Sequence, residues 1–372
     1  MIRVNEPAFE GKELTYLSEC IKTGWISSEG PFVKEFEERF ARFCGVRYGI
    51  ACSNGTNALH LGLLSLGIKK GDEVIIPAFT MIATAYALMY IGAKPVLVDA
   101  ESRTWNMDVD QIEPKVSSKT KAILPVHIYG HPVNMDKVWR IARARKLAIL
   151  EDAAEAHGAE YKGRKCGALG DAAAFSFYAN KIVTTGEGGM VVTNNKNIAE
   201  KAKYFRNMAF QKKVRYLHKD IGYNYRMTNL QAAVGLAQVL RIDRLVAQKR
   251  RIAALYNKRL KRIEGLTTPI EESWAKNVYW MYSILIDKKS FGISRDKFKE
   301  ELLKEGIETR SFFVPMHKQP VFRKMGLFLR EHYPVSEDIS ERGLYLPSGL
   351  NLDEKKIDFI CDKVRKIKQK YD

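Results

Sequence analysis

The sequence predicts an α/β fold with a mainly parallel, doubly wound sheet, followed by a smaller α+β domain. Between about residue 30 and residue 195, short apolar runs alternate with segments of helical periodicity. The runs are too short for helices, so the alternation predicts buried parallel strands joined by helices. Beyond a long helical stretch the alternation ends. We place the domain change there, which gives a large domain over residues 1–245 and a small one over residues 246–372.

In the large domain, apolar residues at helical spacing predict helices over 31–45, 56–67 and 84–92, and a long helical stretch over 229–262. A strand-like run precedes the second of these helices. Further apolar runs predict parallel strands at 72–77, 94–99, 121–127, 147–152, 173–177 and 189–193.

The small domain has a mixed pattern. Residues 280–286 predict a strand and 294–306 a helix. Residues 308–313 predict another strand, and 353–369 a final helix.

Composition excludes several protein classes. The hydrophobic fraction of 46% is typical of a globular protein, and no run of eighteen apolar residues occurs. The N-terminal residues contain no apolar targeting segment, so we expect a cytoplasmic protein. Five scattered cysteines without CxxC spacing argue against a disulfide framework and a zinc site, and we expect no metal.

The net charge of +18 permits three interpretations. The first is a solvated, lysine-rich surface, and the second is a field that attracts an anionic small substrate. The third is binding of nucleic acid. No nucleic-acid-binding motif accompanies the charge, so we do not expect nucleic acid as a partner.

Polar residues follow several predicted strands, where ligands of open α/β sheets bind. Gly55 and Thr56 open a helix, whose N-terminal amides and dipole suit a phosphate; simple helix capping is the alternative. Asp152 ends the run 147–152. A carboxylate there can keep a pyridine nitrogen protonated, although it can also cap the next segment.

A lysine follows the apolar run 173–177. This run leads through Ser176 to Lys181, in a turn rich in Gly and Thr. Burial lowers the pKa of a lysine and makes it a usable nucleophile, whereas most lysines are solvated surface groups. Asn224 and Arg226 lie in an aromatic-rich loop, which we interpret as a recognition loop.

Four segments together resemble the DegT/DnrJ/EryC1/StrS family of sugar aminotransferases. They are SNGT (53–56), EDAAEAHGA (151–159), FSFYANKIVTTGEGG (175–189) and YNYRMTNLQAA (223–233). The segments TGWISSEG, PVHIYG, FVPMH and YLPS extend the resemblance over essentially the whole chain. The resemblance implies a fold-type-I transferase that depends on pyridoxal 5'-phosphate and works as a homodimer with shared active sites.

The resemblance also implies roles for individual residues. Lys181 would carry the cofactor as a Schiff base and move the proton, while Asp152 would pair with the pyridine nitrogen. Glu155 would approach the 3-hydroxyl, where many family members have Gln. The phosphate would be bound by Gly55, Thr56, Ser176 and, from the other subunit, Asn224.

The remaining positions are less specific. Met81 stands where the family often has an aromatic residue stacked on the cofactor, and either Met81 or Phe79 would cover the ring. His157 would lie near the cofactor or simply pack in the core. The expected substrate contacts are Trp25, Ser27, Arg226, Phe313 and His317.

These roles imply transfer of an amino group from glutamate to a nucleotide-linked 4-keto-6-deoxy sugar, with GDP-4-keto-6-deoxymannose as the expected acceptor. A UDP- or dTDP-linked keto sugar or a keto-inositol is the alternative. One family branch has His in place of the lysine and acts as a dehydrase; Lys181 argues against it. A non-catalytic, DNA-binding regulator is the alternative from another class, and the joint presence of Lys181, Asp152 and Ser176 weighs against it.

Overall fold

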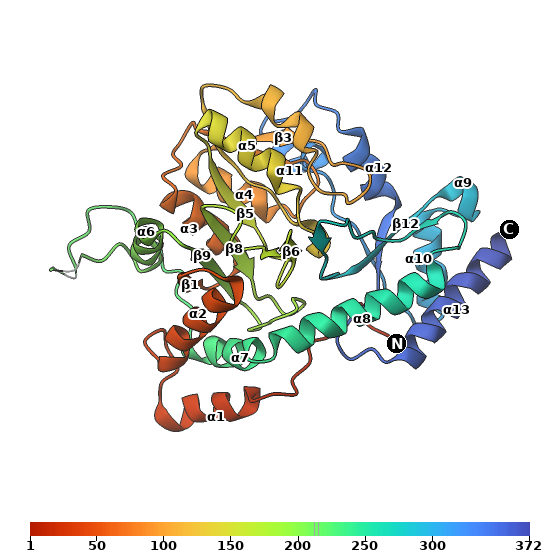
Figure 1. The fold of residues 1–372 in the computed structure, drawn as a ribbon, viewed down its shortest axis with the longest axis horizontal. Coiled ribbons are helices and arrows are strands. Elements are labelled where there is room, and N and C mark those ends of the chain that lie inside the picture. The colour runs from red at the N-terminus through yellow and green to blue at the C-terminus, as the bar shows by residue number, and fades with distance from the viewer. Residues whose placement is uncertain (212, 215) are drawn as a thin grey trace.

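A seven-stranded sheet forms the centre of the molecule (Figure 1). The computed structural model describes residues 1–211, 213–214 and 216–372. The strand order is β1-β9-β8-β5-β4-β2-β3, and every pairing is parallel except those of β9. The predicted α/β class with a mainly parallel sheet is therefore confirmed. The strands are β1 (Tyr48–Cys52), β2 (Glu73–Pro77), β3 (Lys94–Val98), β4 (Thr120–Ile123), β5 (Ala148–Asp152), β8 (Ala172–Ser176) and β9 (Gly189–Thr193).

Strand β9 corrects one prediction, because residues 189–193 were expected to run parallel to their neighbours. The strand is antiparallel to both β1 and β8, with Gly189 opposite Ser176. Parallel neighbours need a crossover, usually a helix, whereas the connection over residues 177–188 contains none and folds straight back. Lys181 lies on this connection, at the carboxyl end of β8.

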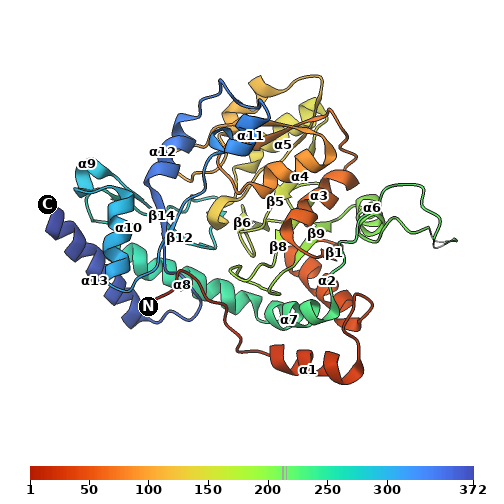
Figure 2. The same ribbon diagram turned by 180° about the vertical axis from the view of Figure 1, so that it is seen from behind.

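Helices cover both faces of the sheet (Figures 1 and 2). Neighbouring side chains of a strand point to opposite faces. Ser176 lies against Gly55 at the start of α3 (Gly55–Ser65), whereas Phe175 packs on Phe40 of α2 (Pro31–Cys44). Thus α3 and α2 lie on opposite faces, which makes the sheet doubly wound. The other helices of this part are α4 (Ala83–Ile91), α5 (Met135–Arg145), α6 (Lys196–Arg206), α7 (Asn229–Val239) and α1 (Glu13–Thr23), which packs against α7.

The helical stretch predicted over 229–262 is two helices, α7 and α8 (Ile242–Leu260). Between them, Arg241 has φ −119° and ψ 10°, and its guanidinium donates to the Ala8 carbonyl and to Glu13. The break coincides with contacts to the N-terminal segment. Neither Pro nor Gly occurs at residues 239–242, so the sequence pattern does not show it.

A second, antiparallel sheet of four strands lies in the C-terminal part, in the order β10-β12-β14-β13. Its core includes Tyr256, Tyr282 and Phe298. The predicted division at residues 245 and 246 falls inside α8 and stays a prediction. The elements here are β10 (Leu266–Thr267), β12 (Tyr282–Ile286), β13 (Arg310–Ser311), β14 (Gly343–Leu346), α9 (Lys288–Phe291), α10 (Arg295–Lys304), α11 (Pro320–Lys324), α12 (Pro334–Arg342) and α13 (Glu354–Tyr371). A three-stranded sheet comprises β6 (Glu160–Tyr161), β7 (Arg164–Lys165) and β11 (Ala275–Lys276).

The N-terminal segment runs from the second sheet toward the Lys181 connection. Ile2 pairs with residues 306–308, and the Val4 carbonyl accepts a hydrogen bond from the Ser348 amide. The side chain of Asn5 then donates to the carbonyl of Asn180, the residue before Lys181. The first residues of the chain thus connect the small sheet to the catalytic side of the large one.

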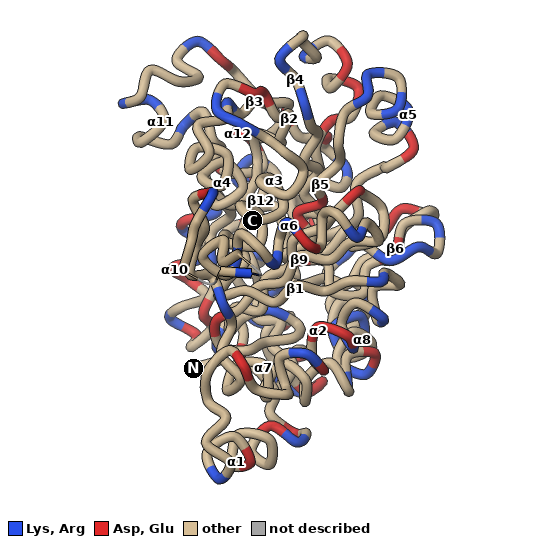
Figure 3. The backbone as a smooth tube through the Cα atoms, turned by 90° about the vertical axis from the view of Figure 1, so that its left-hand side faces the viewer, with Lys and Arg blue, Asp and Glu red and all other residues tan. Residues whose placement is uncertain are grey.

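Charged residues are spread over the molecule. In Figure 3, Lys and Arg occur from α5 to α1 and alternate with Asp and Glu. Such a distribution is typical of a solvated basic surface rather than of a stripe along one groove. Within the described ranges, no helix combines the length and apolar character needed to cross a membrane.

Candidate active site

A cavity of about 320 Å³ opens at the carboxyl ends of β5 and β8. Its volume lies in the range of small-molecule sites. Segments far apart in the sequence meet here, as expected for the strand ends of an open α/β sheet. Eight sequence-predicted residues line it: Gly55, Thr56, Met81, Asp152, Glu155, Ser176, Lys181 and Phe313.

Lys181 lies at this cavity, and only 10% of its side chain is exposed. Its Nζ lies 3.9 Å from Oε1 of Glu155 and 3.8 Å from the ring centroid of Trp280. Burial lowers the pKa of the lysine, and the charges of Glu155 and Asp152 oppose that shift. An amine with a lowered pKa is more often neutral, which nucleophilic attack and proton abstraction both require.

Asp152 lies at the last position of β5 and is also buried. Its carboxylate accepts hydrogen bonds from the Thr84 hydroxyl at 2.8 Å and from the Ala154 amide at 3.2 Å. Burial raises the pKa of this carboxyl, whereas the two hydrogen bonds and the Lys181 charge lower it. A buried carboxylate at a strand end can pair with a protonated ring nitrogen.

Glu155 faces the cavity from the loop that follows β5. Its Oε2 accepts a hydrogen bond from the Tyr129 amide at 2.7 Å. Burial raises the pKa of Glu155, and the Lys181 charge opposes the shift. The carboxyl therefore lies where it can exchange a proton with a polar group in the cavity.

The start of α3 lies at the cavity. Asn54 caps the helix by accepting a hydrogen bond from the Asn57 amide at 2.9 Å, while Gly55 and Thr56 line the cavity. A Cβ on Gly55 would lie 2.7 Å from Cβ of Ser176, so only glycine permits this approach of helix and strand. The amides, the dipole and the Ser176 hydroxyl could together hold a phosphate.

Four predicted contacts lie outside the cavity of their own chain. Asn224 is exposed, and Arg226 donates to Oδ1 of Asn207 at 2.8 Å. Trp25 and Ser27 are exposed in the loop after α1, where their carbonyls accept hydrogen bonds from Asn229. The described chain does not bring these four side chains to Lys181.

Of the remaining candidates, one lines the cavity and two do not. Met81 lines the cavity, whereas Phe79 is buried against Tyr129, Phe312 and Phe313. His317 does not line the cavity, and its Nε2 lies 2.8 Å from Oε1 of Glu337.

His157 is enclosed by the rings of Phe40, Phe175 and Phe177. Burial lowers its pKa to about 3, so the imidazole is neutral near pH 7. Its position is that of a core residue behind the site.

Several residues at the site were missed by sequence reasoning. Trp280, from the segment before β12, contacts the Lys181 amine, and Thr84 in α4 contacts Asp152. For Thr84 a signal existed, because it lies one helical turn after Met81. No such signal exists for Trp280, because the sequence pattern places it in the apolar run 280–286 that predicts a strand. Other missed cavity residues are Asn54, Thr80, Tyr178, Asn180 and Glu187.

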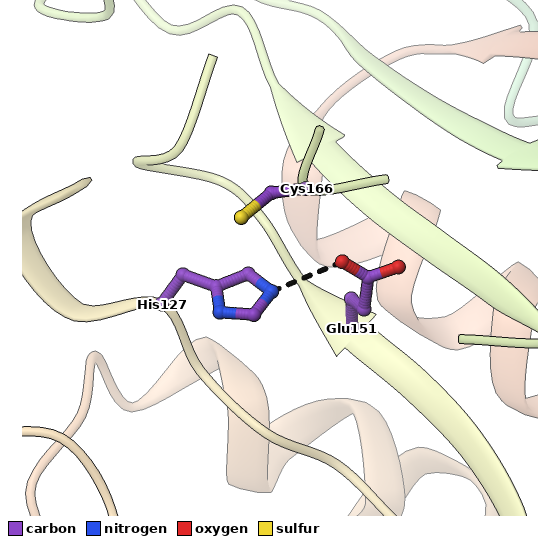
Figure 4. A group of neighbouring side chains, drawn as sticks. All are labelled: His127, Glu151 and Cys166. Carbon is purple, nitrogen blue, oxygen red and sulfur yellow. Dashed lines mark hydrogen bonds and ion pairs between the residues drawn. The ribbon is translucent and has the colours of Figure 1, made fainter. Parts of the chain in front are cut away.

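His127, Glu151 and Cys166 form a buried group of metal-ligand type beside the site (Figure 4). The Val133 amide donates to His127 Nδ1 at 3.0 Å, so Nε2 carries the proton and donates to Glu151. Both Glu151 oxygens also accept backbone amides, from Gly167, Leu169 and Gly170 at 2.8 Å. Burial raises the pKa of the Cys166 thiol. These donors and acceptors are already used, so we interpret the group as structural.

The donor set fits pyridoxal phosphate. The cavity offers a buried amine, a buried carboxylate on β5, and helix amides beside a serine hydroxyl where a Cβ would not fit. These groups match the aldehyde, the ring nitrogen and the phosphate of that cofactor respectively.

Comparisons with known proteins agree with this chemistry. The chain is 42% identical over 366 residues to the GDP-perosamine synthase of Escherichia coli O157:H7, covering 98% of each chain. It is 44% identical to the GDP-perosamine synthase of Caulobacter vibrioides, over 96% of this chain and 95% of that one. The crystal structure of S. venezuelae DesV in complex with a ketimine intermediate superposes with a TM-score of 0.91 at 33% identity, covering 97% of this chain and 95% of that one.

The sequence model of one protein family matches residues 7–365, which is nearly the whole chain. The predicted fold, the pyridoxal phosphate cofactor and the enzyme class are thereby confirmed. The chain belongs to the DegT/DnrJ/EryC1/StrS aminotransferase family and is a pyridoxal-phosphate-dependent sugar aminotransferase.

Proposed function

We propose that the chain transfers an amino group from glutamate to GDP-4-keto-6-deoxymannose in the cytoplasm and forms GDP-perosamine. The observation that carries this proposal is the 42–44% identity, over nearly the full length, to two GDP-perosamine synthases. The cavity supports it, because it combines a buried lysine with an anion-binding helix start.

When bound, pyridoxal phosphate supplies a carbon that bonds amines and a ring that withdraws electrons. In the proposed mechanism, Lys181 Nζ moves a proton at the amino-bearing carbon of glutamate and later at the keto carbon of the sugar. Asp152 would hold the ring nitrogen protonated, and Glu155 would exchange a proton with the ring hydroxyl. Gly55, Thr56 and Ser176 would bind the phosphate, and Met81 would cover the ring.

We also propose a homodimer that shares its active sites. Asn224 is exposed and lies outside its own cavity, so it is available to complete the phosphate site of a second copy. Exposed apolar side chains on α1 and in the loops near residues 25 and 221 support an interface: Leu14, Ile21, Trp25, Ile26 and Ile221. Trp25, Ser27, Arg226, Phe313 and His317 are the proposed contacts to the nucleotide sugar.

The first test is the visible absorption of the purified protein beside Lys181→Ala. The wild type should show the band of bound cofactor, lose it with glutamate and regain it with GDP-4-keto-6-deoxymannose. Recovery with a UDP- or dTDP-linked keto sugar, or with a keto-inositol, would select the alternative substrates. A wild type without a band after addition of the cofactor, together with salt-sensitive DNA binding, would favour the regulator instead.

The second test is complementation between Lys181→Ala and Asn224→Ala. A heterodimer of these variants contains one intact site if Lys181 and Asn224 come from different subunits. Mixing the two weakly active proteins under subunit exchange should therefore restore activity. A mixture no more active than the average of its components would exclude shared sites.

A further inference from the structure

The indole ring of Trp280 lies beside the amine of Lys181, at 3.8 Å from the ring centroid. Oε1 of Glu155 lies 3.9 Å from the same amine. The amine is thus placed between an aromatic face and a carboxylate. An indole face attracts a cation through its quadrupole, and the attraction is stronger where water is excluded.

Trp280 also fixes the backbone that carries the lysine. Its indole N–H donates to the Asn180 carbonyl at 2.8 Å, and Asn180 directly precedes Lys181. The Asn5 side chain donates to the same carbonyl. One tryptophan therefore contacts the amine of Lys181 and the carbonyl of the residue directly before it.

Unusual backbone conformations hold Trp280 in this position. Tyr279 and Tyr129 have backbone φ values of 49° and 55°, which residues other than glycine rarely adopt. The Trp280 amide donates to the Tyr129 carbonyl at 2.9 Å, and a Cβ on Gly130 would lie 3.1 Å from that amide nitrogen. Such conformations persist where the surrounding structure enforces them, and they concentrate at functional sites.

We propose that Trp280 is a positioning residue for Lys181, whose amine rests on the indole face whenever it is not bonded to the cofactor. This inference depends on the function proposed above for Lys181. Between its release at the start of a turnover and its renewed attachment at the end, the amine would be free and would have to carry protons at the site. A free lysine side chain has many rotamers, and holding Nζ between Trp280 and Glu155 keeps it within reach.

The ring also affects the charge of the amine. Because the indole face favours the charged form, removing the ring should let Lys181 lose its proton at lower pH. The charged or titratable groups around the amine are Glu155, Asp152 and His157, and all three remain in a Trp280 variant. A change in the pH profile therefore reports on the ring.

The test compares three variants in single-turnover reactions with glutamate. Trp280→Phe keeps a ring and loses the N–H, whereas Trp280→Leu and Trp280→Met lose both. Met is unbranched and adapts to an irregular gap, which guards against a Leu variant that does not fold. The ring-less variants should lower the maximal rate about tenfold and leave the KM for glutamate within about threefold, while Phe stays within about threefold of wild type. In the ring-less variants the acid limb of the rate should move to lower pH.

Trp139→Leu is the matched control. The Trp139 N–H likewise donates to a backbone carbonyl, of Leu169 at 2.7 Å, and Arg164 lies 5.2 Å from its ring, but it does not line the cavity. This variant should keep wild-type rates and the wild-type pH profile.

Mass spectrometry after borohydride reduction separates the two proposals. If the wild type does not bond the cofactor at Lys181, the proposed function fails. If all variants bond it and the ring-less ones turn over like wild type, only the role of Trp280 fails. A Phe variant as slow as the Met variant would overturn the proposed role of the indole face, because the N–H rather than the ring would then position the lysine.

Discussion

The hydroxyl of Thr84 donates a hydrogen bond to the carboxylate of Asp152, with 2.8 Å between Oγ1 and Oδ2. Thr80 lies behind it, with 3.0 Å between the two threonine hydroxyls. The hydrogen bond opposes the rise in the Asp152 pKa that burial causes. A side chain of α4 therefore helps to keep the carboxyl at the end of β5 ionised.

Thr84→Val should slow the reaction with glutamate about tenfold, because a hydrogen bond to a charged group contributes about 1.5–3 kcal/mol. Without this bond the pKa of Asp152 rises further, so the acid limb of kcat/KM should move to higher pH. The measurement is the pH dependence of kcat/KM. Thr193→Val removes a buried hydroxyl bonded to the Asp171 carbonyl, away from the cavity, and should leave the limb in place. A limb that moves to lower pH in Thr84→Val would contradict the assigned role.

Glu155→Gln should move the acid limb of kcat/KM to lower pH, opposite to the shift expected for Thr84→Val. The Glu155 charge raises the pKa of Lys181, so removing it lets the lysine lose its proton at lower pH. Gln keeps an oxygen acceptor for the Tyr129 amide, and the variant should remain folded. Glu155→Ala leaves that buried amide without its acceptor, which should cost about 1–3 kcal/mol of stability. Rates between pH 6 and 9 and melting temperatures, measured on all three proteins, decide between these effects.

The His127–Glu151–Cys166 group should hold no metal. Dialysis against a chelator is expected to leave the melting temperature and the activity unchanged, and elemental analysis should find well below one ion per chain. Both Glu151 oxygens accept hydrogen bonds from backbone N–H groups. In Glu151→Gln the side-chain NH2 group therefore faces a backbone N–H group in either orientation of the amide. This variant should lose about 3 kcal/mol of stability. A stoichiometric ion lost together with stability would refute the structural interpretation.

Lys249 of α8 allows a test of how a buried lysine affects the stability of the fold. Its side chain is buried, and its Nζ donates to the Ser348 carbonyl at 2.6 Å. Burial lowers the pKa of this lysine to about 7, far below that of an unfolded chain. Between pH 7 and about 10 the unfolded state binds the additional proton, so the stability of the wild type rises with pH in this window.

Lys249→Met should remove this cost and stabilise the protein by about 2 kcal/mol at pH 7. The gain should shrink as the pH approaches 10, because the neutral wild-type lysine is then no longer penalised. Calorimetry at several pH values measures both effects. A gain that increases with pH would show that the native lysine is charged.

Local patterns were sufficient for the central part of the fold and site. The predicted apolar runs 147–152 and 173–177 correspond to strands β5 and β8, which end at Asp152 and Ser176, and Lys181 follows β8 as expected. These positions depend on neighbours in the sequence, which hydrophobic patterns report well. The eight predicted residues at the cavity all lie at or just after strand ends or within the motif segments.

Long-range contacts account for what the patterns could not predict. Trp280 bonds to Asn180, which lies 100 positions away in the sequence, and the break at Arg241 coincides with contacts to Ala8 and Glu13. Helices α1, α5 and α6 mix charged and apolar residues and were not predicted. The direction of β9 depends on its helix-free connection, which a strand pattern does not reveal.

The attachment of Asn5 has a consequence for the order of events during synthesis. The ribosome makes Asn5 long before residues 306–308 and Ser348, on which the neighbours of Asn5 dock. Trp280, the other donor to the Asn180 carbonyl, is made about 100 residues after it. A nascent or truncated chain therefore contains the lysine long before it contains both groups that orient it. Both hydrogen bonds to the peptide before Lys181 can form only after synthesis has passed Ser348.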